Sequence, residues 1–214
     1  MKQPRESTTT PGREERGRTW LAACLLEGHQ RHLASVGRLA GEPLEQVERL
    51  VLLVHDTFRK GGKLLACGNG GSASDAQHLV AELVGRYVEE RRGLPAIALN
   101  TDVAVLTSVA NDYAFEHVFA RQVQALGVSG DLLLAFSTSG RSPNVVAALA
   151  EARARGLRTA AFLGRDGGPA LAGAELAIVV RDQETARIQE CHALMIHLLC
   201  EGLDRLLRDE AGRG

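Results

Sequence analysis

Aromatic side chains are scarce in this chain, since Phe, Trp and Tyr together make up 4% of its 214 residues. A surface that stacks nucleic-acid bases needs several of them, so the composition argues against base stacking. An excess of one charge is missing as well, because 25 Lys and Arg residues stand against 26 Asp and Glu residues. We therefore expect neither a nucleic-acid partner nor a membrane surface as the partner of this protein.

Long apolar runs and paired cysteines are also absent. No run approaches the roughly 20 residues that a membrane span requires, and the polar N-terminus lacks the apolar stretch of a secretory signal. The four cysteines form no CxxC pair; they are Cys24, Cys67, Cys191 and Cys200. We interpret them as small buried apolar side chains in a reducing compartment, which predicts a cytoplasmic protein.

The chain divides into a short tail and one domain. Residues 1–17 are polar and contain prolines and glycines, which predicts a disordered tail. Residues 18–214 suit one domain with a sizeable core. Two amphipathic helices open it, the first from about Thr19 to Val36 and the second from Leu44 to Arg59. Their broad apolar faces suit packing on a sheet or against other subunits, and we favour a subunit interface.

Short apolar runs and helical stretches alternate along the rest of the chain. The runs are residues 63–67, 96–99, 132–136, 159–163 and 176–180. The helical stretches are residues 74–89, 103–126 with a break near Asn111, 144–155 and 184–207. Apolar strands separated by helices are typical of a parallel sheet covered on both faces. We predict an α/β protein with a doubly wound five-stranded parallel sheet and extra N-terminal helices.

Two loops after the first and third runs have the chemistry of a phosphate site. The first loop, residues 68–72, is rich in glycine, and the second, residues 137–142, reads STSGRS. Ligands bind beyond the carboxyl ends of parallel strands, where hydroxyls and a helix N-terminus stabilise a phosphate. Ser142 could instead be a simple helix cap, but four hydroxyls in six residues favour phosphate binding. No GxxxxGK[ST] or complete GxGxxG motif is present, which disfavours a nucleotide.

Acid–base candidates occur on two helices. His78 and Glu82 stand four residues apart and share one helix face, an arrangement that also suits a surface hydrogen bond. On the last helix, Gln189 and His197 fall outside the apolar stripe. Eight residues of helix span about 12 Å, so these two side chains could not easily bind one compact ion together with His78 and Glu82. Such a site requires that long side chains converge, that the helix bends or that different subunits contribute.

These segments together resemble the phosphoheptose isomerases, a family of sugar isomerase (SIS) domain proteins. The resemblance rests on CGNGGSASDAQHLVAELVGRY, ANDYAFEHVFARQV, GDLLLAFSTSGRSPNV, LGRDGG and TARIQECHALMIHLLCE, and covers nearly the whole chain. It implies a flavodoxin-like SIS domain, a homotetramer with active sites at subunit interfaces, and conversion of sedoheptulose 7-phosphate to D-glycero-D-manno-heptose 7-phosphate.

The resemblance also implies residue roles. The implied substrate-binding residues are Asn69, Gly70, Gly71, Ser72, Glu82, Asn111, Asp112, Ser137, Thr138, Ser139, Ser142 and Gln189. Zinc, one ion per subunit, is implied at His78, Glu82, Gln189 and His197. Isomerisation through an enediol needs a base at carbon and an acid at the carbonyl oxygen, and we assign Glu82 as the base and His197 as the acid. Ala186 departs from family members that carry an acidic residue there, so no base acts at that position.

Three other interpretations remain. A related SIS protein is a non-enzymatic scaffold that binds the bacterial replication initiator, and the segments PAIALNTD and LTSVAND resemble that branch too. The chain keeps Glu82 and His197, which favours the enzyme. An SIS isomerase for a five- or six-carbon sugar phosphate, and a sugar-phosphate-sensing domain, are the other two.

Overall fold

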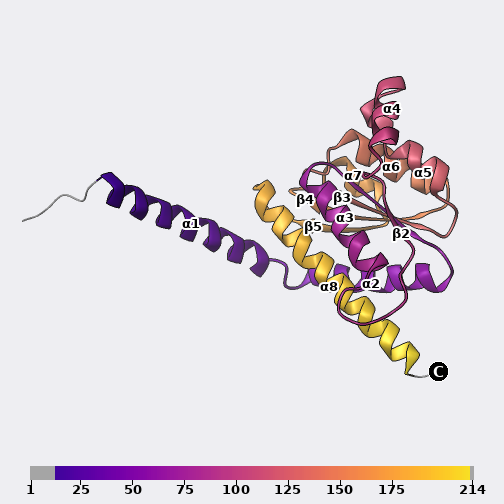
Figure 1. The fold of residues 1–214 in the computed structure, drawn as a ribbon, viewed down its shortest axis with the longest axis horizontal. Helices are drawn as coiled ribbons and strands as arrows, with labels where there is room; N and C mark the ends of the chain where they lie inside the picture. The colour runs from indigo at the N-terminus through magenta and orange to yellow at the C-terminus, as the bar shows by residue number, and fades with distance from the viewer. Residues whose placement is uncertain (1–12, 213–214) are drawn as a thin grey trace, which may run out of the picture.

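The computed structural model describes residues 13–212, and its N-terminal helix extends away from a compact α/β body (Figure 1). The tail expected at 1–17 falls partly outside the described residues, at 1–12. Residues 13–17 belong instead to α1 (Arg13–Gly37). Arg and Glu, which dominate this stretch, are good helix formers, so the helix begins earlier than the apolar pattern indicated.

The predicted five-stranded parallel sheet is confirmed. Its strands are β1 (Leu64–Gly68), β2 (Ala96–Ala98), β3 (Leu132–Ser137), β4 (Arg158–Gly164) and β5 (Leu176–Val180). They lie in the order β2-β1-β3-β4-β5, the flavodoxin-like order of a doubly wound sheet. The chain therefore reverses its direction of travel across the sheet between β1 and β3, which is where such folds bind ligands.

Helices cover both faces of the sheet, as the continuous apolar strands predict. One face carries α2 (Glu42–Arg59), α3 (Gly71–Val84) and α8 (Thr185–Ala211). The other carries α4 (Val103–Asp112), α5 (Ala120–Leu126), α6 (Pro143–Ala154), α7 (Gly168–Gly173) and a 3₁₀ turn, η1 (Phe115–His117). The break expected near Asn111 is confirmed, whereas α7 was not expected from the sequence.

Helix α3 is shorter than predicted: it ends at Val84, whereas the sequence pattern predicted an end at Glu89. Gly85 follows it, and the backbone N–H groups of Val88 and Glu89 donate to the carboxylate of Asp204 on α8. The Asp204 carboxylate thus accepts hydrogen bonds that helical carbonyl groups would otherwise accept. A local sequence pattern cannot reveal an acceptor so distant in the chain.

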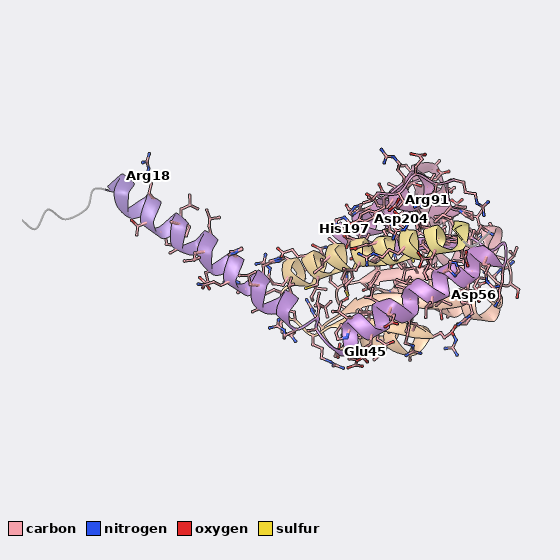
Figure 2. The ribbon with its side chains drawn as sticks, turned by 90° about the horizontal axis from the view of Figure 1, so that it is seen from below. Arg18, Glu45, Asp56, Arg91, His197 and Asp204 are labelled. Carbon is pink, nitrogen blue, oxygen red and sulfur yellow. The ribbon has the colours of Figure 1, made fainter. Side chains whose placement is uncertain are left out.

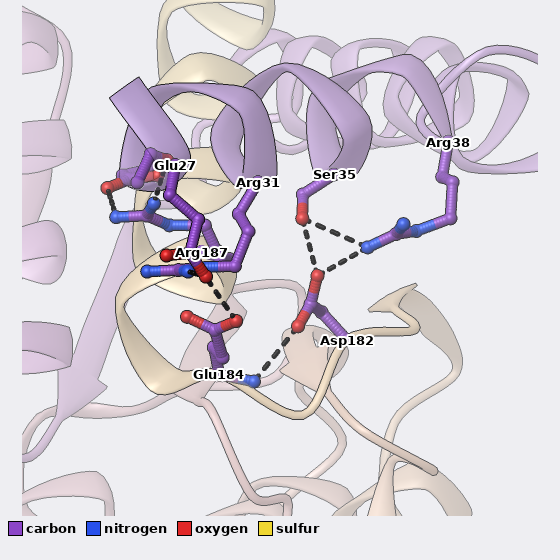
Figure 3. Close-up of polar contacts among 9 residues, drawn as sticks. Glu27, Arg31, Ser35, Arg38, Asp182, Glu184 and Arg187 are labelled. Atoms are coloured by element: carbon purple, nitrogen blue, oxygen red, sulfur yellow. Dashed lines mark hydrogen bonds and ion pairs between the residues drawn. The ribbon is translucent and has the colours of Figure 1, made fainter. Parts of the chain in front are cut away.

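Helix α1 contacts the body through polar side chains near its C-terminal end. Ser35 and Arg38 both donate to Asp182, and Arg31 pairs with Glu184 at 3.2 Å (Figure 3). Large apolar side chains of α1 remain exposed in the single chain; they are Trp20, Leu21, Leu25, Leu26 and Leu33.

The predicted burial is confirmed for three of the four cysteines, Cys67, Cys191 and Cys200, whereas Cys24 is half-buried; all four thiols are free. Among residues 13–212, no helix is both long and apolar enough to cross a membrane.

Candidate active site

The two predicted loops meet at the carboxyl edge of the sheet. β1 and β3 are neighbours, so the loops that follow them lie side by side. Asn69 and Asn144 join them by two reciprocal amide hydrogen bonds of 2.8 and 2.9 Å. Asn144, in the first turn of α6, is a loop-positioning residue that the sequence analysis missed.

The STSG loop, residues 137–142, presents a cluster of hydroxyls at the start of α6. Ser142 is the N-cap residue of α6, as the alternative interpretation expected, but its side chain makes no cap hydrogen bond. Its hydroxyl lies 3.4 Å from that of Ser137, which is buried and accepts from the N–H of Gly140. Ser139 accepts from the N–H of Arg141 at 3.1 Å, and Thr138 is half-buried beside them. The hydroxyls and the start of a 12-residue helix suit an anion.

Gly140 has a φ of 62°, a left-handed conformation that favours glycine. A Cβ there would lie 1.9 Å from the carbonyl oxygen of Gly167, so the loop packs closely on the turn after β4. A larger residue at this position would displace the STSG loop.

Gln189 of α8 lies against the glycine-rich loop at the start of α3. Gly70 is the N-cap of α3 with a φ of 56°, and Gly71 follows it. A Cβ on Gly71 would lie 2.1 Å from Nε2 of Gln189, so the amide lies against this loop. Ser72 is buried, and its N–H donates to the carbonyl of Asn69.

His78, Glu82 and His197 form one cluster between α3 and α8. The Nε2 atoms of His78 and His197 are 3.2 Å apart, and Nε2 of His78 lies 3.4 Å from Oε1 of Glu82. Tyr87, which the sequence analysis missed, stacks on the His197 ring with centroids 5.7 Å apart. The Glu82 side chain is 25% exposed.

Gln189 and His197, both on α8, contact different turns of α3: Gln189 lies beside Gly71, and His197 lies beside His78. The expected separation along α8 is thus observed, and Gln189 does not join the cluster.

Asp75 is a further candidate that the sequence analysis missed. Its Oδ2 is buried without a hydrogen-bond partner within residues 13–212. Burial raises the pKa of this carboxyl to about 6, although the charge of His78 lowers it. The sequence signal that could have identified Asp75 is its position three residues, about one helical turn, before His78.

Asn111 and Asp112 lie apart from the other candidates. Both are exposed at the end of α4, and the amide of Asn111 donates to the carboxylate of Asp112 at 2.8 Å. In the described residues no hydrogen bond joins them to the loops or to the histidine cluster.

The cluster has the nitrogen and oxygen donors that zinc accepts, but it is not a complete site in the single chain. Two ligands of tetrahedral zinc are separated by about 3.3 Å, close to both measured spacings. However, within the part of the chain that the structure describes, no group of three or more His, Cys, Asp or Glu is arranged to hold a metal ion.

Known proteins similar to this chain identify its family. Residues 31–164 match the family model of the SIS domain. A phosphoheptose isomerase of Geobacter sp. (strain M21) is 51% identical over 176 residues, which cover 82% of this chain and 92% of that protein. A phosphoheptose isomerase of Helicobacter pylori (strain ATCC 700392 / 26695) is 52% identical over 161 residues, covering 75% of this chain and 84% of that protein.

Two solved structures are also similar. The phosphoheptose isomerase of Neisseria gonorrhoeae superposes with a TM-score of 0.81 at 39% identity, covering 86% of this chain and 99% of that one. That of Francisella tularensis gives 0.83 at 34% identity, with 86% and 98% covered. The chain therefore belongs to the phosphoheptose isomerase family of SIS-domain proteins.

Proposed function

We propose that this protein is an aldose–ketose isomerase that converts sedoheptulose 7-phosphate to D-glycero-D-manno-heptose 7-phosphate through an enediol. The main support is one arrangement: a hydroxyl-rich loop suited to phosphate at the β1/β3 switch, with the His78–Glu82–His197 cluster further along α3. A terminal phosphate and a distant reacting carbon need two such centres.

The separation of the two centres favours a long sugar. Gly71, in the loop beside the STSG loop, and His78 are seven positions apart on α3, which is about 10 Å of helix. With single bonds of about 1.5 Å in a zigzag, an extended heptose also places C1 roughly 10 Å from a phosphorus on O7. A five-carbon sugar phosphate is shorter by two such bonds, so it would reach the cluster less well.

The mechanism that we propose uses the chain's own groups. Ser137, Thr138, Ser139 and Ser142 bind the phosphate, while Asn69, Gly70, Gly71, Ser72, Asn111, Asp112 and Gln189 bind the sugar. Glu82 removes the proton from the carbon next to the carbonyl, and His197 donates a proton to the carbonyl oxygen. The reverse transfers, at the other carbon and oxygen, complete the isomerisation.

Zinc is part of the proposal, held by His78, Glu82, Gln189 and His197. When bound, it would polarise the sugar carbonyl as a Lewis acid. Because Gln189 lies beside Gly71 in the single chain, a complete site requires its side chain to move or another donor to enter. Elemental analysis of purified protein, with His78→Gln as comparison, tests this directly.

We also propose a cytoplasmic homotetramer whose active sites lie at subunit interfaces. The exposed apolar side chains of α1, of which Trp20 is 68% and Leu25 66% exposed, need a covering surface. Asn111 and Asp112 are exposed and make no hydrogen bond to the other candidates in the described residues, so we assign them to the sugar site of a neighbouring subunit.

The experiment that tests the function is incubation with sedoheptulose 7-phosphate in D₂O, followed by NMR of the products. We expect an aldose heptose phosphate and deuterium incorporation at C1 or C2. If neither appears with any heptose phosphate, with or without zinc, the isomerase proposal fails. The initiator-binding scaffold would then be favoured.

A further inference from the structure

The segment between α3 and β2, residues 85–95, is fastened to α8 by a buried ion pair. Nε of Arg91 donates to Oδ1 of Asp204 at 2.9 Å, and the two side chains are only 10% and 3% exposed. Figure 2 shows Arg91 next to Asp204 of α8, with His197 on the same helix. Burying two charges is costly unless further hydrogen bonds satisfy the remaining donors and acceptors.

Those further hydrogen bonds lead to the end of α3. Nη1 and Nη2 of Arg91 donate to the carbonyl oxygens of Leu83 and Glu82, each at 2.9 Å. The last carbonyls of a helix lack helical partners, and a cation there is favourable. One guanidinium therefore holds the main chain of Glu82, the proposed base.

The carboxylate of Asp204 holds the other end of the same segment. Its Oδ2 accepts from the N–H groups of Val88 and Glu89, at 3.2 and 3.1 Å. Burial would raise the pKa of Asp204, but the hydrogen bonds from Arg91, Glu89 and Val88 lower it below its ordinary value, so the carboxylate stays charged. These bonds fix the backbone next to Tyr87, whose ring stacks on His197.

We propose that Arg91 is a positioning residue of this enzyme: paired with Asp204, it holds Glu82 through its backbone and His197 through the Tyr87 ring. This inference rests on the proposed isomerase function, since it concerns the geometry of the proposed base and acid. One buried pair then sets both groups, and in the described residues it makes no hydrogen bond to the phosphate loop.

Arg91→Lys is the discriminating variant. It keeps a positive charge beside Asp204, but an ammonium lacks the planar fork that bonds the carboxylate and two carbonyls together. A displacement of about 1 Å in a catalytic group can lower the rate roughly a hundredfold. We expect kcat to fall tenfold to a hundredfold, by order of magnitude, with KM changed less than about twofold because the phosphate loop is untouched.

Arg208→Gln is the matched control. Nη1 of Arg208 donates to Oε1 of Glu89 at 3.0 Å, so it ties the same segment to α8 from an exposed position and does not contact Glu82. We expect its kcat and KM to equal those of the unaltered protein.

A readout without substrate separates this inference from the proposed function. Because the Tyr87 ring stacks on the His197 ring, we expect it to shift the NMR signals of the His197 ring protons. Loosening the segment should then move these signals toward their positions in Tyr87→Leu. The shift is expected in Arg91→Lys and not in Arg208→Gln. If no heptose phosphate is turned over, the proposed function fails, while these signals still test the positioning.

The inference is overturned if Arg91→Lys loses stability but keeps both its kcat and its His197 signals. A merely structural pair would give that result. Should Arg91→Lys fail to fold, Tyr87→Leu decides, since the ring is partly exposed and its loss leaves the ion pair intact. An unchanged kcat in Tyr87→Leu would equally overturn it.

Discussion

Replacing Glu82 with Gln should lower the rate of the reaction while leaving the stability of the fold almost unchanged. The amide keeps the size and shape of the side chain but cannot accept a proton from carbon. A general base contributes about 10²–10⁴-fold, so kcat should fall at least about a hundredfold, or roughly 2.7 kcal/mol of transition-state stabilisation.

The effect on folding should be far smaller. Glu82 contacts His78 at 3.4 Å as a partly exposed pair four residues apart, and such pairs contribute about 0.3–0.5 kcal/mol. For a chain of this length, that changes Tm by roughly 1–2 °C. A hundredfold loss of rate in a protein that melts almost normally therefore locates the defect in the reaction.

The assay is turnover of sedoheptulose 7-phosphate together with exchange of its C1/C2 hydrogens in D₂O, and both should be lost in Glu82→Gln. Glu201→Gln is the control, because Glu201 pairs with Arg205 four residues away on the exposed side of α8. A Glu82→Gln protein that keeps more than a tenth of the normal kcat and still exchanges deuterium would refute Glu82 as the base.

Three other predictions follow from different parts of the molecule. Ser139→Ala should raise KM roughly tenfold or more, since a hydrogen bond to a charged group is worth about 1.5–3 kcal/mol; an unchanged KM would remove Ser139 from the phosphate site. Light scattering should give about four times the 22.9 kDa chain mass, and Leu25→Glu should dissociate the assembly; a stable, active monomer would contradict the interface proposal. Burial raises the pKa of Asp75 from 3.8 to about 6, so the folded state binds more protons than the unfolded state between these values and stability falls as pH rises through them. Urea unfolding of Asp75→Asn should lack this decrease, and identical pH profiles for the two proteins would contradict it.

The sequence was sufficient for the architecture. Five apolar runs separated by helical stretches predicted the parallel sheet covered on both faces, because only a strand buried on both sides is apolar throughout. The same local chemistry identified the STSG loop, since hydroxyls, a glycine and a helix start are all contiguous in the chain.

The sequence pattern could not predict contacts between segments that are distant in the chain. The pairing of Asn69 with Asn144 joins residues 75 positions apart, and that of His78 with His197 joins residues 119 apart. Neither pairing leaves a periodic signal, because each side chain is ordinary for its own helix or loop.

The resemblance predicted which residue types matter, and the fold decided where they lie. Local periodicity extended α3 to Glu89, whereas the helix ends at Val84. Arg91 binds carbonyl groups in its last turn, and Asp204 binds the N–H groups of Val88 and Glu89 beyond it. Helix length, hydroxyl clusters and strand burial are local properties, so the sequence by itself determined them. The meeting of Glu82, His197 and Tyr87 depends on how α3 and α8 pack on one face of the sheet, and only the tertiary structure decided it.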